Sequence, residues 1–228
     1  MGLDNEKIEK NPAARIRRKT KGNGRVRFLA EAEEKRLTAA IKSRFPEFLP
    51  HFLLSLHTGM RMSEQYGLHW NQVDFERRQL HLSKTKNGDP RVIPLNAVAL
   101  AALDQLKGKE DRPATEPVFP SARTGDSLQG SRGWFSTALD KAKVPYYTWH
   151  CNRHTFASRL VMAGVDLRTV AELLGHRTLQ MVMRYSHLGP EHQTSAVDRL
   201  VDFQRQKGHQ NGHRRVRGEN SKNTQTSK

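Results

Sequence analysis

The apolar positions of this chain recur mostly three and four residues apart, which is the spacing that buries one face of a helix. Most of the chain is therefore predicted to be helical. The predicted helices cover residues 31–41, 46–57, 63–68, 96–106, 133–142, 149–163, 166–174, 178–188 and 190–206.

Several residues at the ends of these segments are suited to start or stop a helix. Gly59 and Gly175 each follow a helical pattern, as glycine does where the chain turns through a left-handed conformation. Asp166 and Thr178 precede helices and can cap them by accepting a hydrogen bond from a free backbone N–H. Ala30 has no such side-chain oxygen, which should cost the first helix about 1 kcal/mol.

Two short segments between the helices alternate apolar and polar residues, which is typical of strands. They are residues 79–82 and 91–95. Between them, residues 86–89 contain Asn-Gly, the strongest short signal for a hairpin turn. The predicted fold class is therefore α+β, mainly α-helical with a small antiparallel sheet. No parallel sheet of the kind that carries a nucleotide site is predicted.

The net charge of the chain is concentrated near its two ends. Lys and Arg number 39 against 23 Asp and Glu, giving +16. Residues 15–27 hold seven basic side chains and no acid, and residues 205–228 hold seven basic side chains and one acid, so the other 25 basic and 22 acidic residues leave +3. This balance favours an anionic partner, nucleic acid before an acidic membrane. The basic arms are expected to grip phosphates, the alternative being that they are merely solvated tails.

Composition also divides the chain into three parts. A Gly-Asn-Gly run at 22–24 marks residues 1–24 as a basic linker or arm. Residues 25–206 are predicted to form a globular domain, and residues 207–228 a basic disordered tail. One cysteine, Cys151, permits no internal disulfide, and no apolar run is long enough to cross a bilayer. Together with the absence of an apolar signal region at the N-terminus, this predicts a cytoplasmic protein.

Seven polar side chains could together act on a phosphate ester. Two arginines offer planar forks to the non-bridging oxygens and can stabilise the charge that builds up there during phosphoryl transfer. A tyrosine can be the nucleophile if a base takes its proton, and a lysine or histidine can protonate the departing oxygen. The candidates are Arg61, Glu64, Lys86, His150, Arg153, His176 and Tyr185. Glu64 stands three residues after Arg61 and could hold that guanidinium in place.

These residues lie in segments that resemble the catalytic domain of the tyrosine recombinases, or phage-type integrases. The resemblance covers roughly residues 25–190, with the segments in the family's order and at its spacing. They are Thr58-Gly59-Met60-Arg61-Met62-Ser63-Glu64, residues 84–95, His150-x-x-Arg153-His154-Thr155-Phe156-Ala157-Ser158, Leu173-Leu174-Gly175-His176 and Arg184-Tyr185-Ser186-His187-Leu188. The family's separate helical core-binding domain is expected before residue 25, and residues 1–24 do not supply it.

The resemblance implies the recombinase catalytic-domain fold and a site-specific DNA recombinase or integrase of a phage or mobile element. Tyr185 would attack the scissile phosphate, leaving a 3′-phosphotyrosyl link and a free 5′-hydroxyl. Arg61 and Arg153 would clamp the non-bridging oxygens. Lys86 would protonate the 5′-oxygen, His150 would act as general base or acid near the tyrosine, and His176 would donate a hydrogen bond to the phosphate.

The resemblance also implies the partners and cofactors of the reaction. Double-stranded DNA is the implied substrate, bound by a homotetramer that is a monomer off DNA. The phosphotyrosine retains the energy of the broken bond, so the implied reaction requires neither metal nor ATP. A non-catalytic DNA-binding regulator that retains the fold is the alternative function.

Two features of the sequence leave residue assignments open. Lys84 competes with Lys86 for the general-acid role; Lys86 is favoured because it lies at the predicted turn and at the family's distance before Pro94. Cys151 and Asn152 stand where the family usually has an acid and a leucine, which we interpret as an adjustment of helix packing.

Other interpretations of the same side chains are simpler. His150, Cys151, His154 and His176 could hold zinc, but no acidic partner or second cysteine completes that site. His154 and His187 are interpreted as structural residues that support Arg153 and the tyrosine segment. Tyr66, Tyr146 and Tyr147 are weaker candidates for the nucleophile than Tyr185, because none is flanked by the other polar groups.

Overall fold

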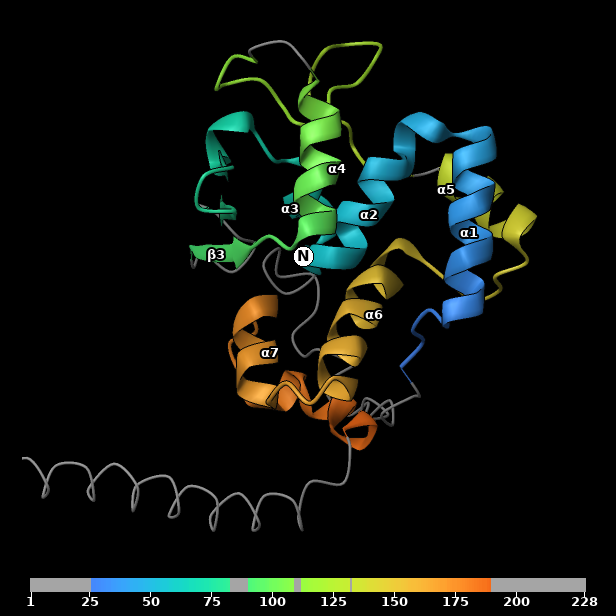
Figure 1. Cartoon of the computed structure of the whole chain (residues 1–228), viewed down its shortest axis with the longest axis vertical. Helices are drawn as coiled ribbons and strands as arrows, with labels where there is room; N and C mark the ends of the chain where they lie inside the picture. The colour runs from blue at the N-terminus through green and yellow to red at the C-terminus, as the bar shows by residue number, and fades with distance from the viewer. Residues whose placement is uncertain (1–25, 83–89, 109–111, 132, 190–228) are drawn as a thin grey trace, which may run out of the picture.

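The computed structural model describes residues 26–82, 90–108, 112–131 and 133–189. The elements follow the predicted order of helices, a small sheet and helices again (Figure 1). They are α1 (Glu31–Arg44), η2 (Pro46–Phe48), α2 (Leu49–Thr58), α3 (Met62–Tyr66), η3 (Trp70–Gln72), β1 (Val73–Asp74), β2 (Gln79–Leu82), β3 (Arg91–Pro94), α4 (Ala97–Lys107), α5 (Trp134–Ala142), α6 (Trp149–Met162), α7 (Leu167–Leu174), η4 (Leu179–Met181) and η5 (Met183–Leu188), where η denotes a 3₁₀ helix. The predicted fold class is confirmed.

The first two helices differ from the prediction at their ends. Ala30 makes no side-chain cap, as expected, but the Glu33 carboxylate accepts a hydrogen bond from the Ala30 backbone N–H at 3.0 Å. The second predicted helix divides into η2 and α2. Pro50 explains where α2 begins, because proline has no N–H to donate and fits an α-helix only in its first turn.

The sheet has three antiparallel strands in the order β1-β2-β3. Leu80 pairs with Ile93 and Leu82 with Arg91, so the predicted pairing of the two longer strands is confirmed. The apolar residues that alternate along them, Leu80, Leu82 and Ile93, are buried. The two-residue strand β1 was not predicted, because it is too short to show any alternation. The predicted turn at 86–89, with Lys84 and Lys86, lies outside the described residues.

Helix α6 connects two hydrophobic cores. The larger core lies among α1, α2, α4, α5 and the sheet, and it includes Trp149 and Cys151 at the start of α6. The smaller core joins Ala157 and Val161, near the end of α6, to α7 and η5. In Figure 1, α6 accordingly runs from the helices in the upper part of the view to α7 below. The middle of α6 therefore lies at the junction of the two cores.

Two buried polar side chains of α6, Asn152 and Thr155, are hydrogen-bonded to other segments. Asn152 is fully buried; its amide donates to Ser55 Oγ at 3.1 Å, and its carbonyl accepts from Tyr147 at 2.8 Å. Thr155 Oγ1 accepts from the Leu29 backbone N–H at 2.9 Å. These bonds fix α6 against α2 and against the segment before α1, because an unpaired polar group at these depths would be costly.

The segment 178–188 is not the α-helix that was predicted. It forms the 3₁₀ helices η4 and η5, and Thr178 makes no capping hydrogen bond. Val182 and Tyr185 are both buried in the smaller core. Val182 lies between the two 3₁₀ helices and Tyr185 lies within η5, and the Tyr185 backbone N–H donates to the Val182 carbonyl at 2.9 Å. The predicted helix 190–206 lies outside the described residues.

None of the helices within the described ranges is both long and apolar enough to cross a membrane.

His51 on α2 is a buried titratable group in an aromatic environment. Its ring lies 4.6 Å from that of Phe119 and 5.1 Å from that of Phe48, measured between centroids. Within the described residues, its Nδ1 has no hydrogen-bond partner. Burial lowers the pKa of His51 from 6.5 to about 4.

We expect this histidine to make the fold sensitive to acid. The unfolded chain binds a proton at His51 below pH 6.5 whereas the folded chain does not until about pH 4, so stability falls as the pH falls through this window. At 1.36 kcal/mol per pH unit, the loss from His51 is roughly 3 kcal/mol. Urea unfolding of wild type and His51→Phe between pH 7.5 and 4 measures it. A variant whose stability falls as steeply as that of wild type would contradict the assignment.

Candidate active site

The turn after α2 positions the first arginine. Gly59 adopts the left-handed conformation (φ +61°), and a Cβ there would lie 2.5 Å from Phe156 Cδ1. The predicted stop at this glycine is thus confirmed, and close packing adds to the requirement for glycine. Arg61 follows as the N-cap residue, directly before α3. The Glu64 carboxylate accepts from the Arg61 backbone N–H at 2.8 Å and from its guanidinium at 2.6 Å, so it orients Arg61 as predicted.

Helix α6 supplies the second arginine from the junction of the two cores. Arg153 is 3% exposed. One guanidinium nitrogen donates to the Gly59 carbonyl at 2.7 Å and the other to the Leu174 carbonyl at 2.5 Å. Arg153 is therefore held between the end of α2 and the end of α7, which are far apart in the sequence.

The C-terminal end of α7 is where three guanidinium groups meet. Gly175 ends the helix in the left-handed conformation. The Leu174 carbonyl accepts from both Arg91 and Arg153, and the Gly175 carbonyl accepts from Arg61 at 3.4 Å. Free carbonyls at a helix C-terminus carry partial negative charge and favour cations. The end of α7 therefore gathers the arginines without neutralising them.

Arg91, at the start of β3, belongs to this cluster although sequence reasoning gave it no role. Its guanidinium donates to Glu64 Oε2 at 2.6 Å, and its side chain is 9% exposed. A Cβ on Gly175 would overlap the Arg91 guanidinium. The sequence contained no clear signal, because an arginine at the first position of a short strand is usually a solvated residue.

The cluster carries an excess of positive charge. Within the described residues, Glu64 is the one carboxylate in hydrogen-bond contact with Arg61, Arg91 or Arg153. Burial, with Arg61 and Arg91 nearby, lowers the pKa of Arg153 to about 9. Burial opposes ionisation of Glu64, but its bond from the Arg61 backbone N–H and the charges of Arg91 and Arg61 lower its pKa overall. Two guanidinium charges remain unbalanced, as a site for a phosphate anion requires.

Two predicted histidines lie around these arginines. His176 directly follows Gly175, and burial, then Arg153 and Arg61, lower its pKa to about 4. His150 lies one helical turn before Arg153 on α6, and burial, then Arg153 and Arg61, lower its pKa as well. Both imidazoles are therefore neutral at pH 7, so each can donate one hydrogen bond and accept another.

The predicted nucleophile makes its hydrogen bond to a different histidine from the one expected. A hydrogen bond of 2.7 Å joins Tyr185 Oη and His154 Nδ1. His150, the histidine expected near the tyrosine, packs against His154 instead, with 4.8 Å between the two ring centroids. Burial raises the pKa of Tyr185, against the charges of Arg184 and Arg153, and burial lowers the pKa of His154 to about 4. The sequence analysis interpreted His154 as a structural support of Arg153 and the tyrosine segment, and it did not predict this direct bond to the tyrosine hydroxyl.

The remaining tyrosines do not share these surroundings. Tyr147 donates to Asn152 in the larger core, and Tyr66 packs against Phe119 and Trp149. Burial raises the pKa of both Tyr66 and Tyr147. Tyr146 is 93% exposed. Of the four tyrosines in the chain, Tyr185 is thus the one whose hydroxyl contacts a histidine of this site.

Of the six predicted catalytic residues, Lys86 lies outside the described residues. The other five come from the N-cap of α3, from α6, from the residue after the Gly175 cap of α7 and from η5. Across the part of the chain that the structure describes, no group of three or more His, Cys, Asp or Glu side chains is arranged to hold a metal ion.

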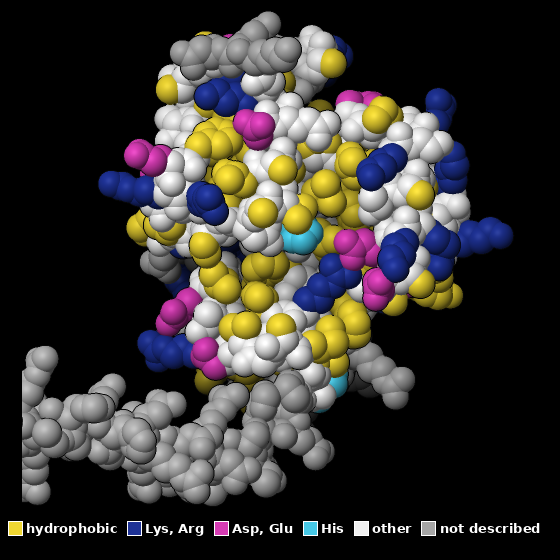
Figure 2. Space-filling view, in the orientation of Figure 1, with side chains coloured by type: hydrophobic (Ala, Val, Ile, Leu, Met, Phe, Trp, Pro, Cys, Tyr) yellow, Lys and Arg dark blue, Asp and Glu magenta, His cyan; other side chains and the backbone are white. Residues whose placement is uncertain are grey.

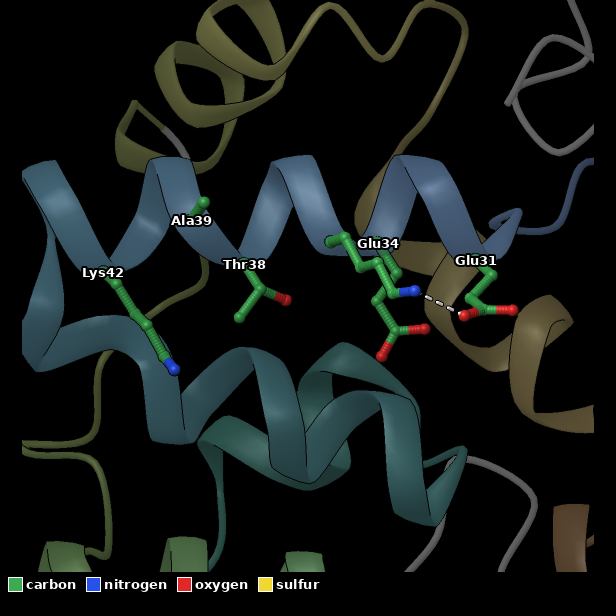
Figure 3. Close-up of a pocket in the computed structure, with 6 residues that line it drawn as sticks. Glu31, Glu34, Thr38, Ala39 and Lys42 are labelled. Carbon is green, nitrogen blue, oxygen red and sulfur yellow. Dashed lines mark ion pairs between the residues drawn. The ribbon is translucent and has the colours of Figure 1, made fainter.

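A shallow groove on α1 is separate from the arginine cluster and its histidines. Glu31, Glu34, Thr38 and Lys42 line it, and Lys35 pairs with Glu31 at 2.7 Å (Figure 3). Helix α1 stands on the other side of the view from β3 and α7 in Figure 1. Basic and acidic side chains are interspersed on the face shown in Figure 2, and we assign no chemistry to the groove.

We expect Gly175→Ala to destabilise the protein by more than its backbone strain. An L-residue in this left-handed conformation costs about 1–2 kcal/mol, and the added methyl group would also displace Arg91. Lys143 provides the control, because it has nearly the same backbone conformation (φ 53°, ψ 50°) at the end of α5. Urea unfolding measures the free energy of unfolding of each variant. The loss caused by Gly175→Ala should exceed the difference in free energy of unfolding between Lys143→Gly and Lys143→Ala. Equal values would contradict the steric argument.

Comparison with known proteins agrees with this geometry. The tyrosine recombinase XerC-like protein of Caldanaerobacter subterraneus subsp. tengcongensis is 28% identical over 215 residues, covering 78% of this chain and 54% of the relative. The solved catalytic domain of bacteriophage HP1 integrase is 29% identical, with a TM-score of 0.60 over 76% of this chain and 94% of that domain. The Tn1549 transposon integrase shares the fold at 24% identity, with a TM-score of 0.63 over 76% of this chain and 67% of that one.

These likenesses confirm the expected catalytic-domain fold. The chain spans about half the length of the curated relatives it matches. The sequence profile of the phage integrase family matches residues 27–192, which is most of this chain. The chain therefore belongs to the phage integrase family.

Proposed function

We propose that this chain is the catalytic part of a site-specific DNA recombinase that cleaves and rejoins DNA through a 3′-phosphotyrosyl intermediate. The observation that carries the proposal is the meeting of Arg61 and Arg153, with excess positive charge, at the end of α7. Tyr185 is hydrogen-bonded to His154, the residue that follows Arg153 on α6. Similarity to proteins named tyrosine recombinase and integrase supports the proposal.

In the first step, Tyr185 Oη forms a bond to the phosphorus of the scissile phosphate, and the bond from phosphorus to the 5′-oxygen breaks. The hydroxyl proton passes to a neutral imidazole, and the 5′-oxygen takes a proton from Lys86. Arg61 and Arg153 stabilise the charge on the non-bridging oxygens, and His176 donates a further hydrogen bond. Attack by the 5′-hydroxyl of another strand reverses the same bond changes and frees the tyrosine.

The burial of Tyr185 bears on how this reaction starts. Its side chain is 2% exposed, so its hydroxyl must move before it can meet a phosphate of bound DNA. His154 is the imidazole in contact with the hydroxyl, and its Nδ1 accepts the hydrogen bond from that hydroxyl in the tautomer that carries hydrogen on Nε2. His150 is then the acid–base group that remains at the phosphate after the tyrosine has moved.

Double-stranded DNA is the proposed partner, and the Tn1549 integrase was solved in complex with a circular intermediate DNA. A homotetramer on two DNA sites, from a monomer off DNA, is the proposed assembly. The basic segments near both ends would add phosphate contacts that do not depend on sequence. The alternative of a non-catalytic regulator is not favoured, because such a protein would not need Tyr185 beside the arginine cluster.

Trapping the covalent adduct tests the proposed reaction. A nicked suicide DNA site loses its short 5′-hydroxyl fragment after cleavage, so the phosphotyrosyl adduct accumulates as a shifted band in a denaturing gel. Wild type should form the adduct, and Tyr185→Phe should form none while still binding DNA. Tyr146→Phe is the control, since that ring is exposed to solvent. Equal behaviour of wild type and Tyr185→Phe would refute the enzymatic proposal.

A modified leaving group distinguishes Lys86 from Lys84. Sulfur in place of the bridging 5′-oxygen leaves as a thiolate and needs no general acid. We expect Lys86→Ala to slow cleavage of ordinary DNA by about 10²–10⁴-fold and to cleave the sulfur-containing DNA almost as fast as wild type. Lys84→Ala should cleave ordinary DNA nearly normally. The reverse pattern between the two variants would assign the general acid to Lys84.

A further inference from the structure

Arg91 shares an acceptor with each of the two arginines proposed to clamp the phosphate. Glu64 accepts from Arg91 through Oε2 at 2.6 Å and from Arg61 through Oε1 at 2.6 Å. The Leu174 carbonyl accepts from Arg91 and from Arg153. Arg91 is thus connected to Arg61 through a carboxylate and to Arg153 through the end of α7.

The surroundings of Arg91 keep it in this bridging position. Its side chain is 9% exposed, and its guanidinium lies where a Cβ on residue 175 would stand, so Gly175 leaves room for it. Its backbone pairs with Leu82 across the sheet. Arg91 is therefore not a solvated surface charge. Both of its terminal guanidinium nitrogens donate within the protein, whereas its Nε has no partner among the described residues.

We propose that Arg91 is a positioning residue, which holds Arg61 and Arg153 at the spacing required for the two oxygens of one phosphate. This inference rests on the proposed function. Arg91 acts on Arg61 through Glu64 Oε2, which also accepts from the Arg61 backbone N–H at 2.8 Å. The second, charged donor on this oxygen offsets the pull of the carboxylate on the Arg61 guanidinium and so keeps Arg61 available to the substrate.

The charge balance of the site supports this role. Without Arg91, the buried Glu64 would have Arg61 as its one cationic partner, and a tighter ion pair would compete with phosphate for Arg61. With Arg91 present, one carboxylate is divided between two guanidinium groups, and Arg61 retains donors for the substrate. The Glu64 side chain is 4% exposed, so water does not screen its attraction for Arg61, and the carboxylate competes effectively with phosphate.

Single-turnover cleavage of the suicide substrate measures the effect on chemistry. We expect Arg91→Gln to reduce the cleavage rate by about 10- to 100-fold, as for loss of a hydrogen bond to a charged group, and to change noncovalent DNA affinity less than about threefold. Arg91→Lys, which keeps the charge but lacks the planar fork, should lie between wild type and Arg91→Gln. Arg77→Gln removes an exposed arginine that pairs weakly with Asp74 and serves as the control.

A double-mutant cycle with Glu64 separates positioning from general support of the fold. If Arg91 acts through Glu64, adding Arg91→Gln to Glu64→Gln should slow cleavage by less than about threefold, because the connection is already broken. If Arg91→Gln slows cleavage in the Glu64→Gln protein by as large a factor as it does in wild type, the proposal is overturned. A wild-type cleavage rate in the Arg91→Gln single variant would also overturn it. If Arg91→Gln fails to fold, Arg91→Lys takes its place in the same cycle.

A second readout does not depend on cleavage. In protein labelled with ¹⁵N-arginine, Arg91→Gln should alter the guanidinium resonances of Arg61 and Arg153, whereas Arg77→Gln should leave them unchanged. Unaltered Arg61 and Arg153 signals would overturn the positioning role. If wild type forms no covalent adduct, the proposed function fails, and the guanidinium signals still decide whether Arg91 positions the other two arginines.

Discussion

The organising constraint of this protein is the packing of three guanidinium groups against the C-terminal end of one short helix, with a single carboxylate among them. The carbonyls of Leu174 and Gly175 accept from Arg61, Arg91 and Arg153, which come from the start of α3, the start of β3 and the middle of α6. Like charges repel, so the cluster depends on the acceptors that α7, Glu64 and the Gly59 carbonyl provide. The acceptors orient the donors and leave a positive field that an anion can complete.

The two-core architecture makes this cluster possible. An arginine in the centre of one hydrophobic core would be unpaired and costly, but Arg153 lies where the larger core ends and the smaller one begins. Helix α6 joins both cores, and Asn152 and Thr155 fix its position through hydrogen bonds to α2, to Tyr147 and to the segment before α1. The position of Arg153 is therefore determined by packing on both sides.

The contact between Tyr185 and His154 shows how the same packing restrains the nucleophile. The 3₁₀ geometry of η5 turns Tyr185 inward, where its hydroxyl meets an imidazole in place of solvent. Burial raises the pKa of the tyrosine and lowers that of the histidine, so the proton stays on the hydroxyl in this arrangement. A tyrosine hydroxyl that is neutral and buried is a poor nucleophile, and it stays so until a partner changes its surroundings.

The sequence by itself determined the features that depend on short-range physics. Hydrophobic spacing, the glycines at 59 and 175 and the cap at Asp166 located most helices, and alternation located the two longer strands. The motifs also indicated the family and five candidate residues that the structure brings around one end of α7. Only the tertiary structure decided the rest. Arg91 entered the site and His154 met Tyr185 through contacts 83 and 31 residues apart in the chain. Residues 178–188 form 3₁₀ helices and not the predicted α-helix, and their spacing alone does not distinguish the two, because residues three apart share a face in both. No local pattern records such contacts, because their energies arise only when distant segments pack together.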